Sequence, residues 1–218
     1  MRPVLLAALA LLLPVSASTA APSLEPAPPG LVRIRINTSE GAIVVALDAR
    51  HAPRTTANFL AYVDDGRLDD TNFYRATRRR GAPQFGFVQG GIGTDARRML
   101  PSVPLEPTNV TGLRHLDGTI SMAHGSNPDS ANGNFSIMVG ANPGLDAGRG
   151  SKGFAAFGQV VSGMAVVRRM LALPTGGGSG DMKGQMLIRP VRLISVQRID
   201  GTPQPTGRVK PWLFGIRR

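Results

Sequence analysis

Short segments in which polar residues separate apolar ones are the feature that most limits how this chain can fold. The pattern runs through residues 32–36, and the same spacing of apolar side chains returns over residues 43–47, after the turn sequence Ser-Glu-Gly at 39–41. A period of two is the period of a β-strand that buries one of its faces. This part of the chain therefore predicts a β-hairpin.

Further segments bounded by Gly, Pro, Asn or Asp predict more short strands, near residues 72–76, 86–89, 118–123, 135–139, 155–160 and 191–199. Two segments have helical spacing instead. Residues 52–66 carry proline in the first turn, apolar side chains on one face and glycine at the exit, and apolar residues recur at helical spacing over 164–171. Many short strands with two helices predict a mainly β fold, a closed antiparallel barrel with helices over its ends.

The first 30 residues are predicted to precede the folded domain and to begin with a targeting signal. Arg2, an uncharged apolar run over 4–15 and small residues up to 21 have the pattern of a secretory signal peptide. The apolar run is too short to span a bilayer. We therefore expect a cleaved signal peptide over 1–20, a Pro-rich leader over 21–30, one domain over 31–200 and a basic, aromatic tail over 201–218. The protein is predicted to be exported, periplasmic and without a transmembrane span.

The formal net charge of +11 permits attraction to nucleic acid, anionic lipid or acidic proteins. The basic residues lie in arginine clusters and in the tail, without the interleaved aromatic residues that a base-stacking surface needs. Together with the export signal, this predicts a solvated basic surface and no nucleic-acid partner. The tail could dock on the barrel, on a partner or on anionic lipid, and the sequence does not decide between them. Cysteine is absent, so packing without disulfides must hold the fold.

Six segments, in order, resemble motifs of the cyclophilin family, of the exported bacterial kind. They are Ala-Pro-Arg-Thr-Thr-Ala-Asn-Phe at 52–59, Asn-Phe-Tyr-Arg at 72–75, Val-Gln-Gly-Gly at 88–91, Gly-Thr-Ile-Ser-Met-Ala at 118–123, Asp-Ser-Ala-Asn-Gly-Asn-Phe-Ser-Ile at 129–137 and Phe-Gly-Gln-Val-Val-Ser-Gly-Met at 157–164. Each match is weak alone, but their common order makes the resemblance specific. It implies a mainly β fold, a closed eight-stranded antiparallel cyclophilin-like barrel with two capping helices.

The resemblance also implies peptidyl-prolyl cis–trans isomerisation, without a cofactor or metal, on Pro-containing segments of exported proteins. Arg75 would be the catalytic guanidinium, and Gln89 would hold the substrate backbone and support Arg75. Taken alone, Arg75 would be interpreted as an ordinary surface arginine. The remaining substrate-binding candidates are Phe85, Phe87, Met122, Ala123, His124, Asn134, Ser136, Leu145 and Phe154.

Several positions depart from the family pattern. Ser136 replaces an aromatic ring of the pocket, Asn134 stands where glutamine is usual, Gly144 where many members carry tryptophan, and Phe154 where histidine is usual. The connection from Arg75 to Gln89 is longer than usual, so either Phe85 or Phe87 would line the proline pocket.

These departures predict weaker proline binding, and they leave open an alternative in which a catalytically weak cyclophilin-like module only binds Pro-containing segments. A monomer is expected. His51, His115 and His124 lack metal-like spacing and are predicted to be surface or loop histidines. The glycine-rich residues 176–180 lack the Lys-Ser/Thr ending of a phosphate-binding loop and are interpreted as a flexible connection.

Overall fold

The computed structural model describes residues 29–215. The predicted signal peptide, most of the predicted leader and the last three residues lie outside this range. The strands are β1 (Leu31–Thr38), β2 (Gly41–Asp48), β3 (Thr71–Arg79), β4 (Ala82–Gly91), β5 (Thr119–Met122), β6 (Asn134–Val139), β7 (Ala155–Ser162), β8 (Thr175–Gly176) and β9 (Met186–Arg198). The α-helices are α1 (Pro53–Asp64), α2 (Thr108–Thr111) and α3 (Met164–Ala172).

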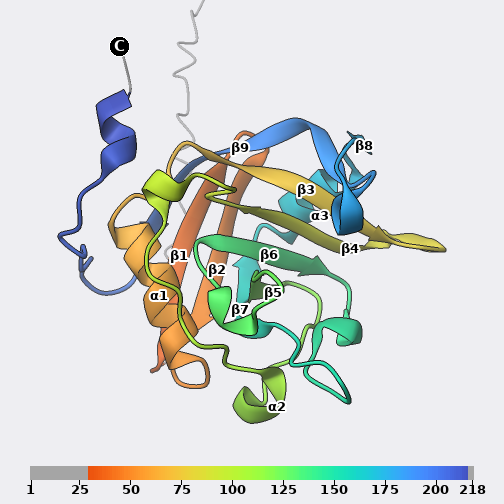
Figure 1. Ribbon diagram of the computed structural model, residues 1–218, viewed down its shortest axis with the longest axis horizontal. Coiled ribbons are helices and arrows are strands. Elements are labelled where there is room, and N and C mark those ends of the chain that lie inside the picture. The colour runs from red at the N-terminus through yellow and green to blue at the C-terminus, as the bar shows by residue number, and fades with distance from the viewer. Residues whose placement is uncertain (1–28, 216–218) are drawn as a thin grey trace, which may run out of the picture.

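Eight of these strands form a closed antiparallel barrel, as predicted (Figure 1). Their order is β1-β2-β7-β5-β6-β4-β3-β9, and pairing of β1 with β9 closes the ring. Closure leaves none of these strands with an unpaired edge. The two-residue strand β8 lies outside the ring and pairs only with β9. Its second residue, Gly176, is the first residue of the glycine-rich segment 176–180, which the sequence predicted to be a flexible connection.

The barrel is filled by the apolar side chains of the predicted alternation. Residues such as Ile34 and Ile36 of β1 are fully buried, while the polar residues between them face outward. Helix α1 inserts Phe59, whose ring lies 5.2 Å from that of Phe135 and 5.3 Å from that of Phe157, measured between centroids. Helix α3 adds four buried apolar residues to the same core. The two predicted helices therefore complete the core, and α2 is a short additional helix.

The tail residues that the structure describes pack against the end of α1. Trp212, in the 3₁₀ turn η5 (Pro211–Gly215), is only 5% exposed, and its ring lies under the guanidinium groups of Arg67 and Arg98 at 4.8 and 5.2 Å from its centroid. The main-chain nitrogen and the hydroxyl of Thr206 both donate to the Asp65 carboxylate. Docking on the barrel is thus the arrangement adopted by residues 201–215.

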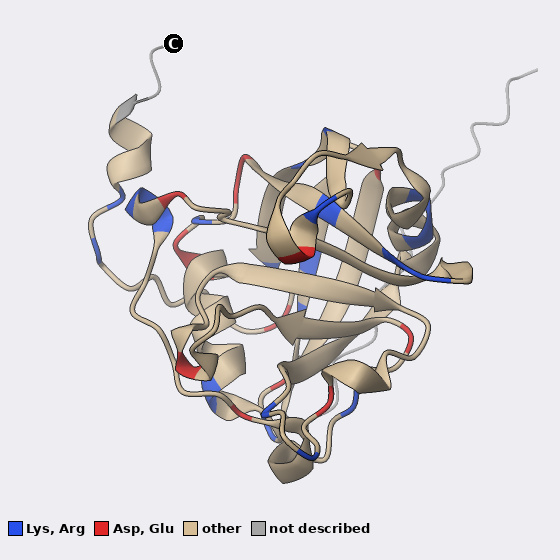
Figure 2. Ribbon diagram, turned by 45° about the vertical axis from the view of Figure 1, so that its right-hand side comes forward, with Lys and Arg blue, Asp and Glu red and all other residues tan. Residues whose placement is uncertain are grey.

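Lys and Arg are spread over the ends and the outer wall of the barrel, with acidic residues among them (Figure 2). Several arginines form ion pairs, such as Arg33 with Asp200 at 2.7 Å and Arg192 with Asp70 at 2.5 Å. In the part of the chain that the structure describes, no helix is both long enough and apolar enough to cross a bilayer.

Candidate active site

A bulge in β3 turns two consecutive side chains to the outside of the barrel. Phe73 and Ala76 are buried in the core, at 0 and 1% exposed. Between them, the pairing with β4 passes from Phe73 opposite Gly90 directly to Arg75 opposite Gln89, so Tyr74 is the extra residue. An inserted residue of this kind locally re-aims the side chains of a strand. Tyr74 and Arg75 consequently both lie on the outer face.

Arg75 begins a row of side chains that crosses four neighbouring strands. Gln89 lies opposite Arg75, Ser136 lies opposite Gln89, and Ser121 lies opposite Ser136. Residues directly opposed in a sheet point to the same face. The next residues along β4 and β6, such as Val88, point into the core instead. The row therefore belongs to the outer wall.

The guanidinium of Arg75 is held by several acceptors. Its Nη1 donates to Gln89 Oε1 at 2.9 Å, its Nε and Nη2 donate to Gln185 Oε1 at 2.9 and 2.7 Å, and Nη2 also donates to the carbonyl of Asp181 at 3.2 Å. Burial lowers the pKa of Arg75 from its ordinary value. A guanidinium is nevertheless charged at neutral pH, because its ordinary pKa lies above about 12.

Gln89 extends this network away from Arg75. Its Nε2 donates to the Tyr74 hydroxyl at 3.1 Å, and that hydroxyl donates to Asn134 Oδ1 at 3.3 Å. Burial is the largest effect on Tyr74 and raises the pKa of its hydroxyl. Asn134 is fixed in turn by Gly93, whose main-chain nitrogen donates to Oδ1 at 2.8 Å and whose carbonyl accepts from Nδ2 at 2.9 Å. Arg75 thus bonds Gln89 directly, and Tyr74, which was not among the predicted site residues, links Gln89 to Asn134.

Two hollows lie beside this network. One, of about 760 Å³, is lined by Tyr74, Gln89, Ala123, His124, Asn134 and Met182, among others. The other, of about 660 Å³, is lined by Arg79, Phe87, Ala141, Asn142, Pro143, Gly144 and Leu145. The ring of Phe87 lies 5.3 Å from the Arg75 guanidinium carbon. A peptide bound across this surface would contact the amide of Gln89, the guanidinium of Arg75 and the ring of Phe87.

The structure separates the two phenylalanines of the long β3–β4 hairpin. Phe87 faces Arg75, whereas Phe85 is 37% exposed and lies under Arg79, with its ring 5.4 Å from the guanidinium carbon. The ring of Phe85 also packs so closely on Gly140 that a Cβ there would lie 2.4 Å from it. Phe87 is therefore the ring beside the candidate catalytic arginine.

Other predicted site residues do not line the hollows. Met122 is 1% exposed and belongs to the core, because the pleat of β5 turns it inward. Ser136 lies in the outer row but is covered, at 8% exposed. Phe154 stacks on His124, with ring centroids 4.3 Å apart, and its main-chain nitrogen donates to the carbonyl of Leu145. Phe154 thus supports His124 and the loop that carries Leu145.

His115 lies in a loop, as the prediction of a surface or loop histidine allows, but it is buried rather than at the surface. It is 1% exposed, and its Nδ1 lies 2.6 Å from Asp146 Oδ1 while its Nε2 lies 2.8 Å from Ser121 Oγ. The residue types are those of a hydrolase triad, but Ser121 is only 2% exposed, so its hydroxyl is closed to a substrate. The trio therefore ties the loop that carries Leu145 to the outer row. Sequence gave no signal for it, because Asp146 is distant in the chain.

The pKa of His115 predicts how the stability of the fold depends on pH. Burial, which outweighs the opposing effect of the hydrogen bond that His115 donates to Asp146, lowers the pKa of His115 below its ordinary value. As the pH falls, His115 is therefore protonated in the unfolded chain before it is protonated in the folded one. The stabilisation from its neutral, buried form is complete above about pH 6.5 and is lost as the pH falls further. We expect the free energy of unfolding, measured by urea denaturation, to decline between pH 7 and 5 less steeply in His115→Gln than in the wild type. Equal slopes would contradict the assignment.

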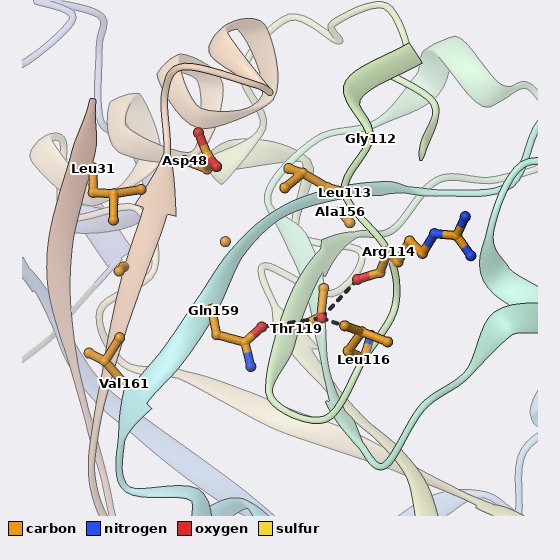
Figure 3. Close-up of a pocket in the computed structure, with 12 residues that line it drawn as sticks. Leu31, Asp48, Gly112, Leu113, Arg114, Leu116, Thr119, Ala156, Gln159 and Val161 are labelled. Carbon is orange, nitrogen blue, oxygen red and sulfur yellow. Dashed lines mark hydrogen bonds between the residues drawn. The ribbon is translucent and has the colours of Figure 1, made fainter. Parts of the chain in front are cut away.

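A third hollow lies on another part of the barrel. It has about 440 Å³ and is lined by residues of β1, β2, β5 and β7 and of the segment 112–116, including Leu31, Leu113, Leu116 and Val161 (Figure 3). None of the predicted site residues lines it. Thr119 donates there to the carbonyl of Arg114 at 3.0 Å, which holds the segment against the barrel. Within residues 29–215, no three side chains of His, Cys, Asp or Glu converge as metal ligands do.

Comparisons with known proteins agree with this geometry. The sequence profile of the family described as "Cyclophilin type peptidyl-prolyl cis-trans isomerase/CLD" matches residues 32–197. The chain is 34% identical over 164 residues to a peptidyl-prolyl cis-trans isomerase of Acinetobacter baylyi, covering 75% of this chain and 84% of the relative. It is 38% identical over 142 residues to peptidyl-prolyl cis-trans isomerase A of Dickeya dadantii, covering 65 and 72%.

A solved structure of similar fold is the Cryptosporidium parvum cyclophilin type peptidyl-prolyl cis-trans isomerase, crystallised in the presence of the dipeptide Ala-Pro. It aligns with a TM-score of 0.63 at 20% identity and covers 78% of this chain and 99% of the other. At that identity the likeness concerns the fold. The sequence profile, the two bacterial relatives and the shared barrel together establish that this chain belongs to the cyclophilin-type peptidyl-prolyl cis–trans isomerase family.

Proposed function

We propose that this chain catalyses rotation about X–Pro bonds with the guanidinium of Arg75. The C–N bond of a planar amide has partial double-bond character, which gives a rotation barrier of roughly 18–20 kcal/mol. As the bond twists, the nitrogen becomes pyramidal and its lone pair is no longer shared with the carbonyl. A fixed cation stabilises that lone pair more in the twisted state than in the planar one, and so lowers the barrier. The proposal depends above all on the 2.9 Å bond between Arg75 and Gln89 beside two hollows.

The remaining groups would hold the peptide. Phe87 and Leu145 line the hollow that would receive the proline ring, and such apolar pockets with a few polar groups are typical of ligand sites. Gln89 Nε2 and the main chain around Ala123 and His124 border the neighbouring hollow, where the residues before the proline would lie. No nucleophile or general base is needed, because no covalent bond breaks.

The sequence of the first 21 residues supports an exported enzyme. A basic start, a short apolar run and small residues at the exit are the features of a secretory signal. We therefore infer that the chain acts in the periplasm, on Pro-containing segments of exported proteins. Slow X–Pro isomerisation, which takes tens of seconds or more, would otherwise delay their folding.

A direct assay tests the proposed activity. The chain without residues 1–20 is expected to accelerate cis–trans exchange of an Ala-Pro peptide, measured by NMR exchange spectroscopy. The second candidate function is a module that binds such segments without turning them over. It is favoured by Gly144, which leaves the proline hollow without a ring at that position, and by Ser136, where the family usually carries an aromatic residue. An uncatalysed exchange rate together with peptide-induced chemical shift changes would establish the binding module instead.

Restoring an aromatic ring should strengthen peptide binding. Gly144 lines the proline hollow, is exposed, and has open space around an added Cβ. Burying one ring contributes about 1.5–3 kcal/mol, so we expect Gly144→Trp to lower the KM for an Ala-Pro peptide about tenfold or more. Gly148→Trp is the matched control, because Gly148 is also exposed and uncrowded but lies outside this hollow. Equal KM values for the two variants would contradict the placement of the proline.

A further inference from the structure

The segment 177–185 is a part of the fold that neither the family motifs nor the proposed chemistry uses. It follows β8, includes the 3₁₀ turn η4 (Gly180–Met182) and ends at the residue before β9. The prediction of a flexible connection covers only residues 176–180 of this part of the chain. In Figure 1 the loop between β8 and β9 lies beside β3, the strand that carries Arg75.

This segment supplies most of the acceptors that hold Arg75. Gln185 Oε1 accepts from Nε at 2.9 Å and from Nη2 at 2.7 Å, and the Asp181 carbonyl accepts from Nη2 at 3.2 Å. With the bond from Nη1 to Gln89, four hydrogen bonds hold a group that has five N–H donors. Counting partners within residues 29–215, the one N–H left over is on Nη1, the nitrogen that bonds Gln89, and Gln89 lines the hollow of about 760 Å³.

Gln185 is held in place by groups other than Arg75. Its carbonyl accepts from the Ala76 nitrogen at 3.0 Å, and its nitrogen donates to the Met182 carbonyl at 3.0 Å. Thr77 Oγ1 also donates to Gln185 Oε1, at 2.7 Å, which orients the amide with its oxygen toward β3. Gly178 has a φ of +75°, and a Cβ there would lie 2.4 Å from the Met182 carbonyl oxygen. The glycine-rich sequence thus permits a closed loop that presents one amide oxygen.

The acceptors of Arg75 share a chemical property. All of them, from Gln89, Gln185 and the Asp181 main chain, are neutral amide oxygens. In the described part of the chain, no carboxylate lies within ion-pair distance of Arg75. The Asp181 carboxylate lies farther away and raises the pKa of Arg75, but the opposite effect of burial is larger. Neutral acceptors fix the direction of a guanidinium but leave its charge unbalanced, whereas a carboxylate would neutralise it.

We propose that Gln185 is a positioning residue for isomerisation, which holds Arg75 in the reactive orientation without neutralising it. This inference depends on the proposed role of Arg75. Gln185 does not line either hollow, so its effect passes through Arg75 and belongs to the chemical step. Loss of orientation at a reacting group typically costs one to two orders of magnitude in rate.

Two substitutions test the two parts of the role. Gln185→Leu removes the acceptor, and Gln185→Glu keeps an acceptor oxygen but adds a charge. For both we expect kcat on an Ala-Pro peptide to fall about tenfold or more with KM unchanged, since the hollows are untouched. Gln197→Leu and Gln197→Glu are the matched controls, because Gln197 is an exposed glutamine of the same strand region. Urea unfolding of every variant checks that the fold is kept.

The outcomes separate this inference from the proposed function. Adding Gln185→Leu to Arg75→Ala should cause no further loss, and the Arg75 Nε–H should exchange with solvent faster in Gln185→Leu than in the wild type. Full activity of Gln185→Glu would show that the acceptor at this position need not be neutral, and would overturn the inference. If Arg75→Ala is inactive while Gln185→Leu keeps the wild-type kcat, only the positioning role fails. If Arg75→Ala is fully active, the proposed function fails with it.

Discussion

Arg75→Ala is expected to lower kcat/KM for an Ala-Pro peptide about a hundred- to a thousandfold, since losing one preorganised transition-state donor typically costs 2.7–4 kcal/mol. The structure supplies the reason in this chain. Arg75 is held by Gln89 and Gln185 and lies beside Phe87, so its charge is already oriented when the peptide arrives. Such preorganisation needs no rearrangement during the reaction. NMR exchange spectroscopy on the peptide measures the effect.

Two further variants sharpen this test. Arg75→Lys keeps the positive charge but loses the planar fork that bonds Gln89 and Gln185 together, so we expect activity closer to that of Arg75→Ala than to the wild type. Arg80→Ala is the control, because Arg80 is an exposed arginine in the turn of the same hairpin. Wild-type activity in Arg75→Ala would show that the reaction does not use this guanidinium.

Asp65→Asn should destabilise the fold by about 3–5 kcal/mol, because it leaves the buried guanidinium of Arg67 without its carboxylate partner. Arg67 is 2% exposed, and its Nε donates to Asp65 Oδ2 at 2.7 Å. Burial raises the pKa of Asp65, but hydrogen bonds from Thr206 and Arg67 outweigh it and hold the pKa below its ordinary value. The carboxylate therefore stabilises the fold above about pH 4 and loses this effect at lower pH.

The matched control is an ion pair on the surface. Asp70 and Arg192 lie 2.5 Å apart, but their side chains are 55 and 63% exposed. Exposed pairs contribute less than about 1 kcal/mol, so Asp70→Asn should change the free energy of unfolding little. Urea denaturation at pH 7 compares the two variants. Equal losses would mean that the Asp65–Arg67 pair does not hold the tail against α1.

The two experiments report on different ends of the molecule. The Arg75 network lies on the outer wall of β3 and β4, whereas the Asp65 pair joins the end of α1 to the tail through Thr206 and Val209. Asp65→Asn should therefore lower stability while leaving kcat of the folded protein unchanged. The opposite is expected of Arg75→Ala, whose effect belongs to the reaction.

The order of short strands and helices along the sequence was enough to predict a closed barrel. Alternation in β1 and β2, the proline at the start of α1 and the apolar face of α3 are local patterns, and each fixes which side of an element is buried. Motif order then identified Arg75 and Gln89, which the structure places opposite each other. The targeting prediction depends on residues outside 29–215 and stays a prediction.

Only the tertiary structure decided which distant side chains meet. The bulge at Tyr74, the choice of Phe87 over Phe85, the burial of His115 and the acceptor from Gln185 all arise from strand register and loop closure. Arg75 and Gln185 are 110 positions apart, and Arg67 and Val209 are 142 apart. A local period specifies which face of an element is apolar, but partners at such separations are set by how the whole barrel closes, so the sequence pattern could not show them.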